Sequence, residues 1–158
     1  MIPTRRLTVL LVLCGTGAAS WAGWALAARR GVLPPEVPWT VPVLLLAIAA
    51  AVLVLGWTVR QYQQGKRPGI DMIRAARTAV LGKASAFTGA VLGGWYGGQL
   101  LCLLGELVNE PLRRAALAAA LATVAALVLA VVGLLVERFC RLPPPKDEPA
   151  AGEEPTPA

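Results

Sequence analysis

The chain of 158 residues contains no histidine, and only nine of its residues are acidic. Its three cysteines, Cys14, Cys102 and Cys140, are scattered along the chain without paired spacing. The absence of imidazole excludes a histidine-based catalytic triad, and the cysteine spacing supports neither a zinc site nor a disulfide framework. We therefore expect no catalytic residue, no metal site and no cofactor.

Charge is missing from four long stretches that together take up more than half of the chain. The uncharged runs are residues 7–28, 37–59, 84–105 and 115–136. A helix crosses the hydrocarbon core of a bilayer in roughly 20 residues, whereas the strands of a membrane barrel are about ten residues long and alternate in character. The sequence therefore predicts an all-α membrane protein, a bundle of four transmembrane helices.

The four helices form one expected transmembrane domain, residues 1–141, which is followed by a tail, residues 142–158. We expect the helices over about residues 7–28, 39–59, 79–105 and 115–136. The tail is rich in proline and acid, and has no large apolar residue after Leu142. Such a segment buries too little surface to offset the entropy lost on ordering, which predicts a disordered tail.

The net charge of +6 is spread over the ends of the apolar runs instead of one basic face, so nucleic acid is not an expected partner. One set of ends carries eleven basic residues and the opposite set carries four. The positive-inside rule then places both termini in the cytoplasm. The Ala- and Arg-rich composition is typical of a GC-rich bacterium, which indicates the inner membrane. We expect anionic lipid headgroups to meet Arg60, Lys66, Arg67, Arg74 and Arg77.

Two segments beside the runs have alternative interpretations. Arg5 and Arg6 precede an apolar stretch as in a signal peptide, but the run continues to spanning length, which favours a retained first helix. Between the second and third runs, Asp71 is placed as an N-cap of a short amphipathic helix at the lipid surface. That helix would serve as a lipid anchor, or alternatively as a partner-binding surface.

The third run is unusual because small residues recur every four positions. The two columns are Ser85, Gly89, Gly93 and Gly97, and Gly82, Ala86, Ala90, Gly94 and Gly98. Such columns let helix backbones approach closely in lipid. A matching column on the first helix consists of Gly15, Ala19, Gly23 and Ala27. We predict that the third helix is the packing centre of the bundle.

A polar and aromatic stripe lies beside these columns: Ser85, Thr88, Trp95, Tyr96 and Gln99, with Lys83 at its cytoplasmic end. Intramembrane polar groups mark candidate ligand sites, but they also serve as hydrogen-bonding contacts between helices. The sequence leaves both interpretations open. Lys83 and Glu137 lie at the same expected level of the membrane, so we also expect them to form an ion pair.

Several short motifs resemble those of a family of small actinobacterial membrane proteins of unknown function, the domain-of-unknown-function family 3180. The motifs are Pro3-Thr4-Arg5, Leu55-Gly56-Trp57 with Arg60, Asp71, Arg74-Ala75-Ala76-Arg77-Thr78, Lys83-Ala84-Ser85, Gly94-Trp95-Tyr96 with Gln99, and Glu137-Arg138 with Cys140-Arg141. The resemblance covers about residues 3–144. It implies four membrane helices, no assigned activity and genes often found beside those of folate biosynthesis.

These observations favour a non-enzymatic, accessory membrane protein that packs through its third helix against a second copy or another membrane protein. The alternative is a small transporter subunit or ligand-binding protein with a site near Trp95, Tyr96, Gln99 and Lys83. An intramembrane enzyme fits less well, because no acid–base pair or nucleophile is in place for it.

Overall fold

The computed structural model describes residues 6–63, 72–106 and 109–139, and all regular structure within these ranges is helical. The elements are α1 (Arg6–Ala28), α2 (Thr40–Gln63), α3 (Met72–Leu103), the 3₁₀ turn η1 (Leu104–Glu106) and α4 (Glu110–Phe139). The prediction of an all-α chain with four long helices is thereby confirmed for the described residues. The predictions for Lys66, Arg67, Asp71 and the tail lie outside these ranges.

Three of the helices are long and apolar enough to cross a membrane: α1, α4 and residues Thr40–Gln61 of α2. The helix α3 does not meet the same criterion, although it is the longest of the four. Its many glycines, together with Lys83, Ser85 and Gln99, replace the leucine and valine that make the other helices strongly apolar. The three apolar helices indicate a membrane protein, while the fourth span stays a prediction.

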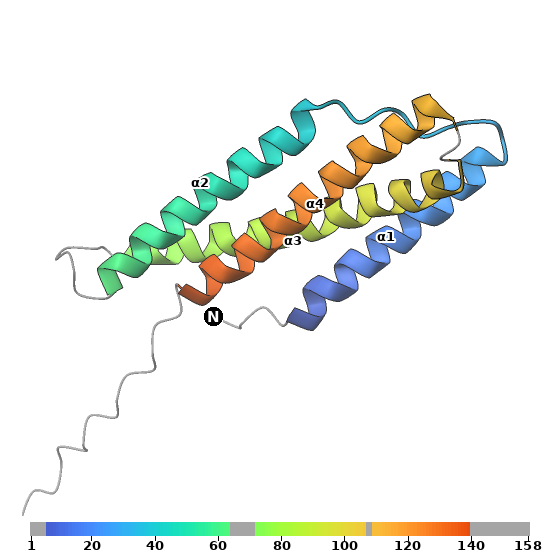
Figure 1. The fold of residues 1–158 in the computed structure, drawn as a ribbon. Helices are drawn as coiled ribbons and strands as arrows, with labels where there is room; N and C mark the ends of the chain where they lie inside the picture. Colours follow the sequence, from blue (N-terminus) through green and yellow to red (C-terminus); the bar gives the residue numbers. More distant parts are fainter. Residues whose placement is uncertain (1–5, 64–71, 107–108, 140–158) are drawn as a thin grey trace, which may run out of the picture.

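The antiparallel pair of α3 and α4 forms the centre of the molecule (Figure 1). On one side α1 packs against α3, and on the other side α2 packs mainly against α4 (Figure 1). Within the described residues, the backbone of α1 lies close to neither α2 nor α4. The fold therefore depends on α3 to hold α1, and on α4 to hold most of α2.

The helices α1, α3 and α4 begin earlier than the uncharged runs suggested, whereas α2 begins slightly later. At 1.5 Å per residue, the 32 residues of α3 extend about 48 Å, well beyond a hydrocarbon core of about 30 Å. The amphipathic segment expected at the lipid surface is therefore joined to the span in one unbroken helix from Met72. The helix α2 begins at Thr40 and includes Pro42 in its first turn, where a missing amide proton costs no helical hydrogen bond.

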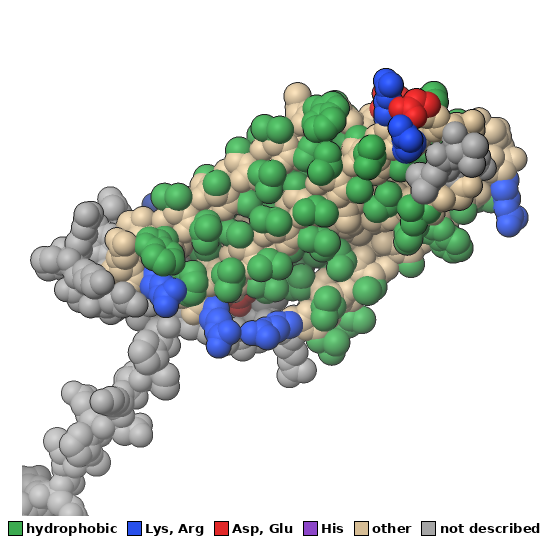
Figure 2. Space-filling view, viewed as in Figure 1, with side chains coloured by type: hydrophobic (Ala, Val, Ile, Leu, Met, Phe, Trp, Pro, Cys, Tyr) green, Lys and Arg blue, Asp and Glu red, His purple; other side chains and the backbone are tan. Residues whose placement is uncertain are grey.

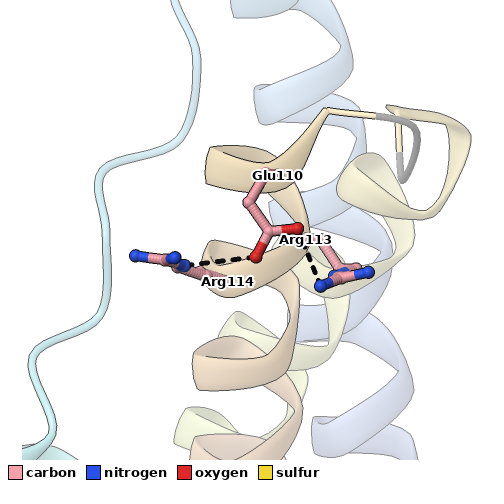
Figure 3. Close-up of polar contacts among 3 residues, drawn as sticks. All are labelled: Glu110, Arg113 and Arg114. Carbon is pink, nitrogen blue, oxygen red and sulfur yellow. Dashed lines mark hydrogen bonds and ion pairs between the residues drawn. The ribbon is translucent and has the colours of Figure 1, made fainter.

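The start of α4 is stabilised in a similar way. Pro111 lies in the first turn, and the carboxylate of Glu110 lies near the helix N-terminus, where negative charge is favourable. Glu110 also accepts ion pairs from Arg113 at 2.7 Å and Arg114 at 3.4 Å (Figure 3). All three side chains are more than half exposed, so each pair contributes well under about 1 kcal/mol.

Apolar side chains cover the flank of the bundle, and charged side chains gather at its two ends (Figure 2). Among the described residues, the end where α1 and α3 begin carries Arg6, Arg60, Arg77, Lys83 and Arg138. There the Arg60 guanidinium lies over the rings of Trp57 and Phe139, at 5.7 and 4.6 Å from their centroids. The other end carries Arg29, Arg30, Arg113 and Arg114. The fold thus brings together the basic groups that the sequence assigned to the same side.

Candidate functional site

The contact between α3 and α4 is made by backbone against backbone. A Cβ atom added to Gly89 would lie 2.5 Å from the amide nitrogen of Ala130 and 2.6 Å from the carbonyl oxygen of Ala126. From the opposite side, a Cβ atom on Gly133 would lie 2.5 Å from the amide nitrogen of Ala86. No side chain fits at either position unless the helices move apart, so these glycines set the distance between the two central helices.

The contact between α3 and α1 is equally close and uses a different face of α3. A Cβ atom on Gly98 would lie 2.7 Å from the carbonyl oxygen of Gly17 and from the amide nitrogen of Trp21. A Cβ atom on Gly94 would overlap the hydroxyl of Thr16. The small residues of α3 therefore contact two different helices. Gly82 and Gly89 contact α4, whereas Gly94 and Gly98 contact α1.

The face of α1 that meets α3 differs from the one that the sequence suggested. We expected the column containing Gly15 and Gly23, but a Cβ atom at either position would meet nothing within 4 Å. The contact is made instead by Thr16, Gly17 and Ser20. Thr16 and Ser20 are also four residues apart, so the sequence contains a signal for this face, but it is weaker than the competing column of four small residues.

The buried polar side chains of the bundle donate hydrogen bonds to backbone carbonyl groups. The hydroxyl of Ser20, 4% exposed, donates to the Trp95 carbonyl at 2.8 Å and so joins α1 to α3. The amide of Gln99, 2% exposed, donates to the Pro35 carbonyl at 2.8 Å and so joins α3 to the loop before α2. Ser85 donates to Leu81 within α3 at 2.9 Å. These groups are thus engaged in holding the chain together.

The remaining members of the predicted polar stripe point to different neighbours. Trp95 is 49% exposed and packs edge-on against Trp24, with ring centroids 6.2 Å apart. Tyr96 packs with Val37 and with two alanines of α4. Thr88 and Lys83 are exposed. All six stripe residues are described, and the structure places them against different neighbours, so the prediction that they form one ligand site stays a prediction.

The expected ion pair between Lys83 and Glu137 is not among the ion pairs that join described residues. The reason is the rotation of α3 about its axis. A Cβ atom on Gly82 would lie 3.1 Å from the Glu137 amide nitrogen, so position 82 faces α4 at this level. The next residue, Lys83, is turned about 100° further around the helix and is exposed.

A groove runs along α3 between α1 and α4, whose backbones do not approach each other closely. Its volume is about 550 Å³, and its lining is almost wholly apolar. Gly93 and Gly97 form part of the floor, Cys14 and Trp21 belong to the α1 wall, and Leu127 belongs to the α4 wall. No residue of the predicted polar stripe lines it, because that stripe lies on the opposite side of α3. The sequence did not predict this groove.

The family comparison agrees with the resemblance seen in the motifs. The model of a family described as "Protein of unknown function (DUF3180)" matches residues 9–144. The chain belongs to this family. No curated protein and no solved structure matches the chain. The match covers all four helices and ends soon after α4, so the groove and the glycine contacts lie within the family domain.

We predict that Ser20→Ala loosens the contact between α1 and α3 without changing the fold. The substitution removes the hydrogen bond to the Trp95 carbonyl, and such bonds between membrane helices contribute about 0.6 kcal/mol on average and at most about 1.7. Unfolding by denaturing detergent, followed by circular dichroism, measures the change. Thr58→Ala is the matched control, because the Thr58 hydroxyl bonds only within its own helix, to Val54. A Ser20→Ala protein as stable as the Thr58→Ala protein would contradict the prediction.

Proposed function

We propose that this chain is a non-catalytic, accessory protein of the bacterial plasma membrane, with four spans and with both termini in the cytoplasm. The family match supports no narrower activity, since the family itself is one of unknown function. The proposal is carried by one observation: the buried polar side chains Ser20, Ser85 and Gln99 all donate to backbone carbonyl groups of the chain. Polar groups used in this way stabilise a scaffold.

The arrangement of α3 supports its assignment as the fourth span and as the packing centre. Its C-terminal part, around Gly93 to Gly98, lies between α1 and α4, and both of those helices are apolar enough to cross a membrane. A helix enclosed by its neighbours needs fewer large apolar side chains than one surrounded by lipid, because its glycines meet protein. The low apolar content of α3 is therefore compatible with a position at membrane depth.

The basic groups support the orientation with both termini inside. The sequence assigns eleven basic residues to one side of the membrane and four to the other. Of these, the described residues Arg6, Arg60, Arg77, Lys83 and Arg138 lie at the end of the bundle where α1 begins and α4 ends. Basic residues close to the ends of spans are retained on the cytoplasmic side. On this orientation, Arg60 and Arg77 are exposed at the level of anionic cytoplasmic headgroups.

The outward faces of α2 and α1 are the surfaces that this proposal assigns to a membrane-protein partner or to a second copy. Leu44 and Val54 on α2 and Leu11 on α1 are each more than 60% exposed. By contrast, Gly89, Gly94 and Gly98 of α3 are occupied by contacts within the chain. A partner helix therefore meets the bundle from outside these contacts.

Site-specific photocrosslinking in living cells tests this proposal. A photoreactive amino acid is placed at Leu11, Leu44 or Val54, and the crosslinked products are identified by mass spectrometry. We expect one discrete protein adduct, either with a second copy or with one membrane protein, from at least one of these exposed positions. The matched control is Val52, which is 4% exposed on α2 and should give adducts only within the chain.

Two results would contradict the accessory assignment. One is the absence of any protein adduct from all three exposed positions while the chain is correctly inserted. The other is solute or ion flux through vesicles that contain the purified chain alone, since a scaffold on its own has no such activity.

A further inference from the structure

We infer that the groove between α1 and α4 binds one acyl chain of a phospholipid, whose phosphate lies beside Arg29 and Arg30. This inference goes beyond the accessory function and depends only on insertion of the helices into the bilayer.

The depth of the groove identifies the surrounding medium. Its walls include Leu13, Gly17 and Trp21, in the middle part of α1, a helix long and apolar enough to span the membrane. At that depth the medium is hydrocarbon, and an open apolar groove cannot hold water, which would need polar partners. The groove must therefore be filled by a lipid chain or by apolar protein side chains.

The width of the groove selects the lipid chain over a helix. A Cβ atom at Gly93 would lie 3.1 Å from Cδ1 of Leu13 and 3.4 Å from Cδ2 of Leu127, so both walls reach the same point of the floor. An α-helix with its side chains is about 10–12 Å across and cannot enter between them. A single polymethylene chain is narrow enough to follow the floor from this constriction toward Gly97, where only a Thr123 methyl lies within 4 Å.

The volume also fits one chain. Pockets that hold small ligands measure about 300–1,000 Å³, and the groove, at about 550 Å³, lies within this range. It therefore offers room for part or all of one fatty acyl chain. The other chain of the same lipid would remain in the surrounding bilayer, because the groove is open on its outer side.

The positive charge near the wide end of the groove is complementary to the negative charge of a phosphate. Arg29 and Arg30 follow α1 directly, are exposed, and form no ion pair with any described residue. Arg29 lies eight residues beyond Trp21, about 12 Å along the helix axis, and one leaflet of hydrocarbon is about 15 Å thick. A phospholipid in that leaflet can therefore place its phosphate at these bases and its acyl chain beside Trp21 and Gly97.

The test uses the full chain in phosphatidylcholine vesicles that contain a small fraction of phosphatidylglycerol with a photoactivatable diazirine on one acyl chain. After irradiation, peptide mass spectrometry locates the lipid adducts. We expect adducts concentrated on groove residues such as Cys14, Trp21 and Leu127. Adducts at the exposed leucines of α2 give the background level for annular lipid.

Two filling variants and one matched control complete the design. Gly97→Leu fills the floor and Ala18→Leu fills the α1 wall, which is exposed there and tolerates a larger side chain. Gly23→Leu makes the same kind of change on α1 where nothing lies within 4 Å. We expect groove labelling to fall to the annular background in both filling variants and to stay at the wild-type level in Gly23→Leu. Circular dichroism of each variant verifies that the bundle is folded.

A second measurement addresses the headgroup. Native mass spectrometry of the wild-type chain released from mild detergent should show one retained phospholipid, which the double variant Arg29→Gln/Arg30→Gln loses more readily.

Adducts distributed evenly over α1 and α2, or labelling that both folded filling variants leave unchanged, would overturn the inference. A photoreactive amino acid placed at Cys14 that gave a protein–protein adduct, while the photoactivatable lipid gave no adduct there, would assign the groove to a second copy and overturn the inference as well. The absence of lipid adducts anywhere would contradict insertion itself, and with it the proposed function.

Discussion

Replacing Gly89 by alanine is expected to destabilise the bundle by about 1–3 kcal/mol, the range found for overpacked interiors. In an isolated helix the same replacement is stabilising by about 0.8–1.0 kcal/mol, because glycine is the weaker helix former. The sign reverses here because the new methyl group would lie 2.5 Å from the backbone of Ala130, and two packed helices cannot both keep their positions. Unfolding of the purified protein in denaturing detergent, with circular dichroism as the readout, measures the difference.

Gly15→Ala is the matched control for this prediction. A Cβ atom at Gly15 meets nothing within 4 Å, so only the helix-propensity gain should remain, up to about 1 kcal/mol. If Gly89→Ala and Gly15→Ala changed stability in the same direction, the close approach of α3 and α4 would not exist in the membrane protein.

Gly98→Val is expected to release α1 from the rest of the bundle while α2, α3 and α4 stay together. A Cβ atom at this position would lie 2.7 Å from three atoms of α1, and within the described residues the backbone of α1 lies close to neither α2 nor α4, which could otherwise hold it in place. We expect a cost near the upper part of the overpacking range, about 3 kcal/mol, all of it at the interface between α1 and α3.

Spin-label distances measure this release directly. One label is attached to Cys14, which is exposed on α1, and a second to cysteine introduced at Val124, which is exposed on α4; Cys102 and Cys140 are changed to serine. The distance distribution should be narrow in the parent protein, broad in Gly98→Val and narrow again in the control Gly23→Val. A narrow, unshifted distribution in Gly98→Val would show that α1 is held by contacts other than those with α3.

Both predictions reflect how a bundle gains stability in lipid. Association of helices there gains little from removing apolar surface from water, so close packing and hydrogen bonds between helices must supply most of the free energy. The central helix of this chain supplies them through Gly89, Gly94 and Gly98 and through the Trp95 carbonyl. Adding a single methyl group at one of these positions is therefore expected to change the stability of the bundle more than the small size of the group would suggest.

The sequence by itself determined the four long helices and their approximate positions, but not their ends, since α3 begins at Met72 and α4 at Glu110, before the predicted starts. Uncharged runs of spanning length predict helices because backbone groups in hydrocarbon must be satisfied within their own segment. Because successive membrane-spanning helices run in opposite directions, the runs also predicted which basic residues lie at the same end of the bundle. The sequence also predicted that the small residues of α3 make close contacts, but it did not predict the faces, since the column from Gly82 to Gly98 meets α4 at its start and α1 at its end.

Only the tertiary structure decided which helix meets which face. An Ala- and Gly-rich chain contains several small-residue columns with the same spacing, and periodicity does not state how far each helix is rotated about its axis. The rotation of α1 toward Thr16, Gly17 and Ser20, away from Gly15 and Gly23, is such a choice.

The hydrogen bond from Gln99 to the Pro35 carbonyl and the groove beside Gly97 also arise from the arrangement in space. Their partners lie far apart along the chain, and the groove exists because α1 and α4 both contact α3 while their backbones do not approach each other closely. The local sequence pattern determines which faces of each helix carry small residues that could make a close contact. The packing of all four helices determines which of these faces makes the contact, because a close contact on one face of a helix excludes the alternative contacts on the others.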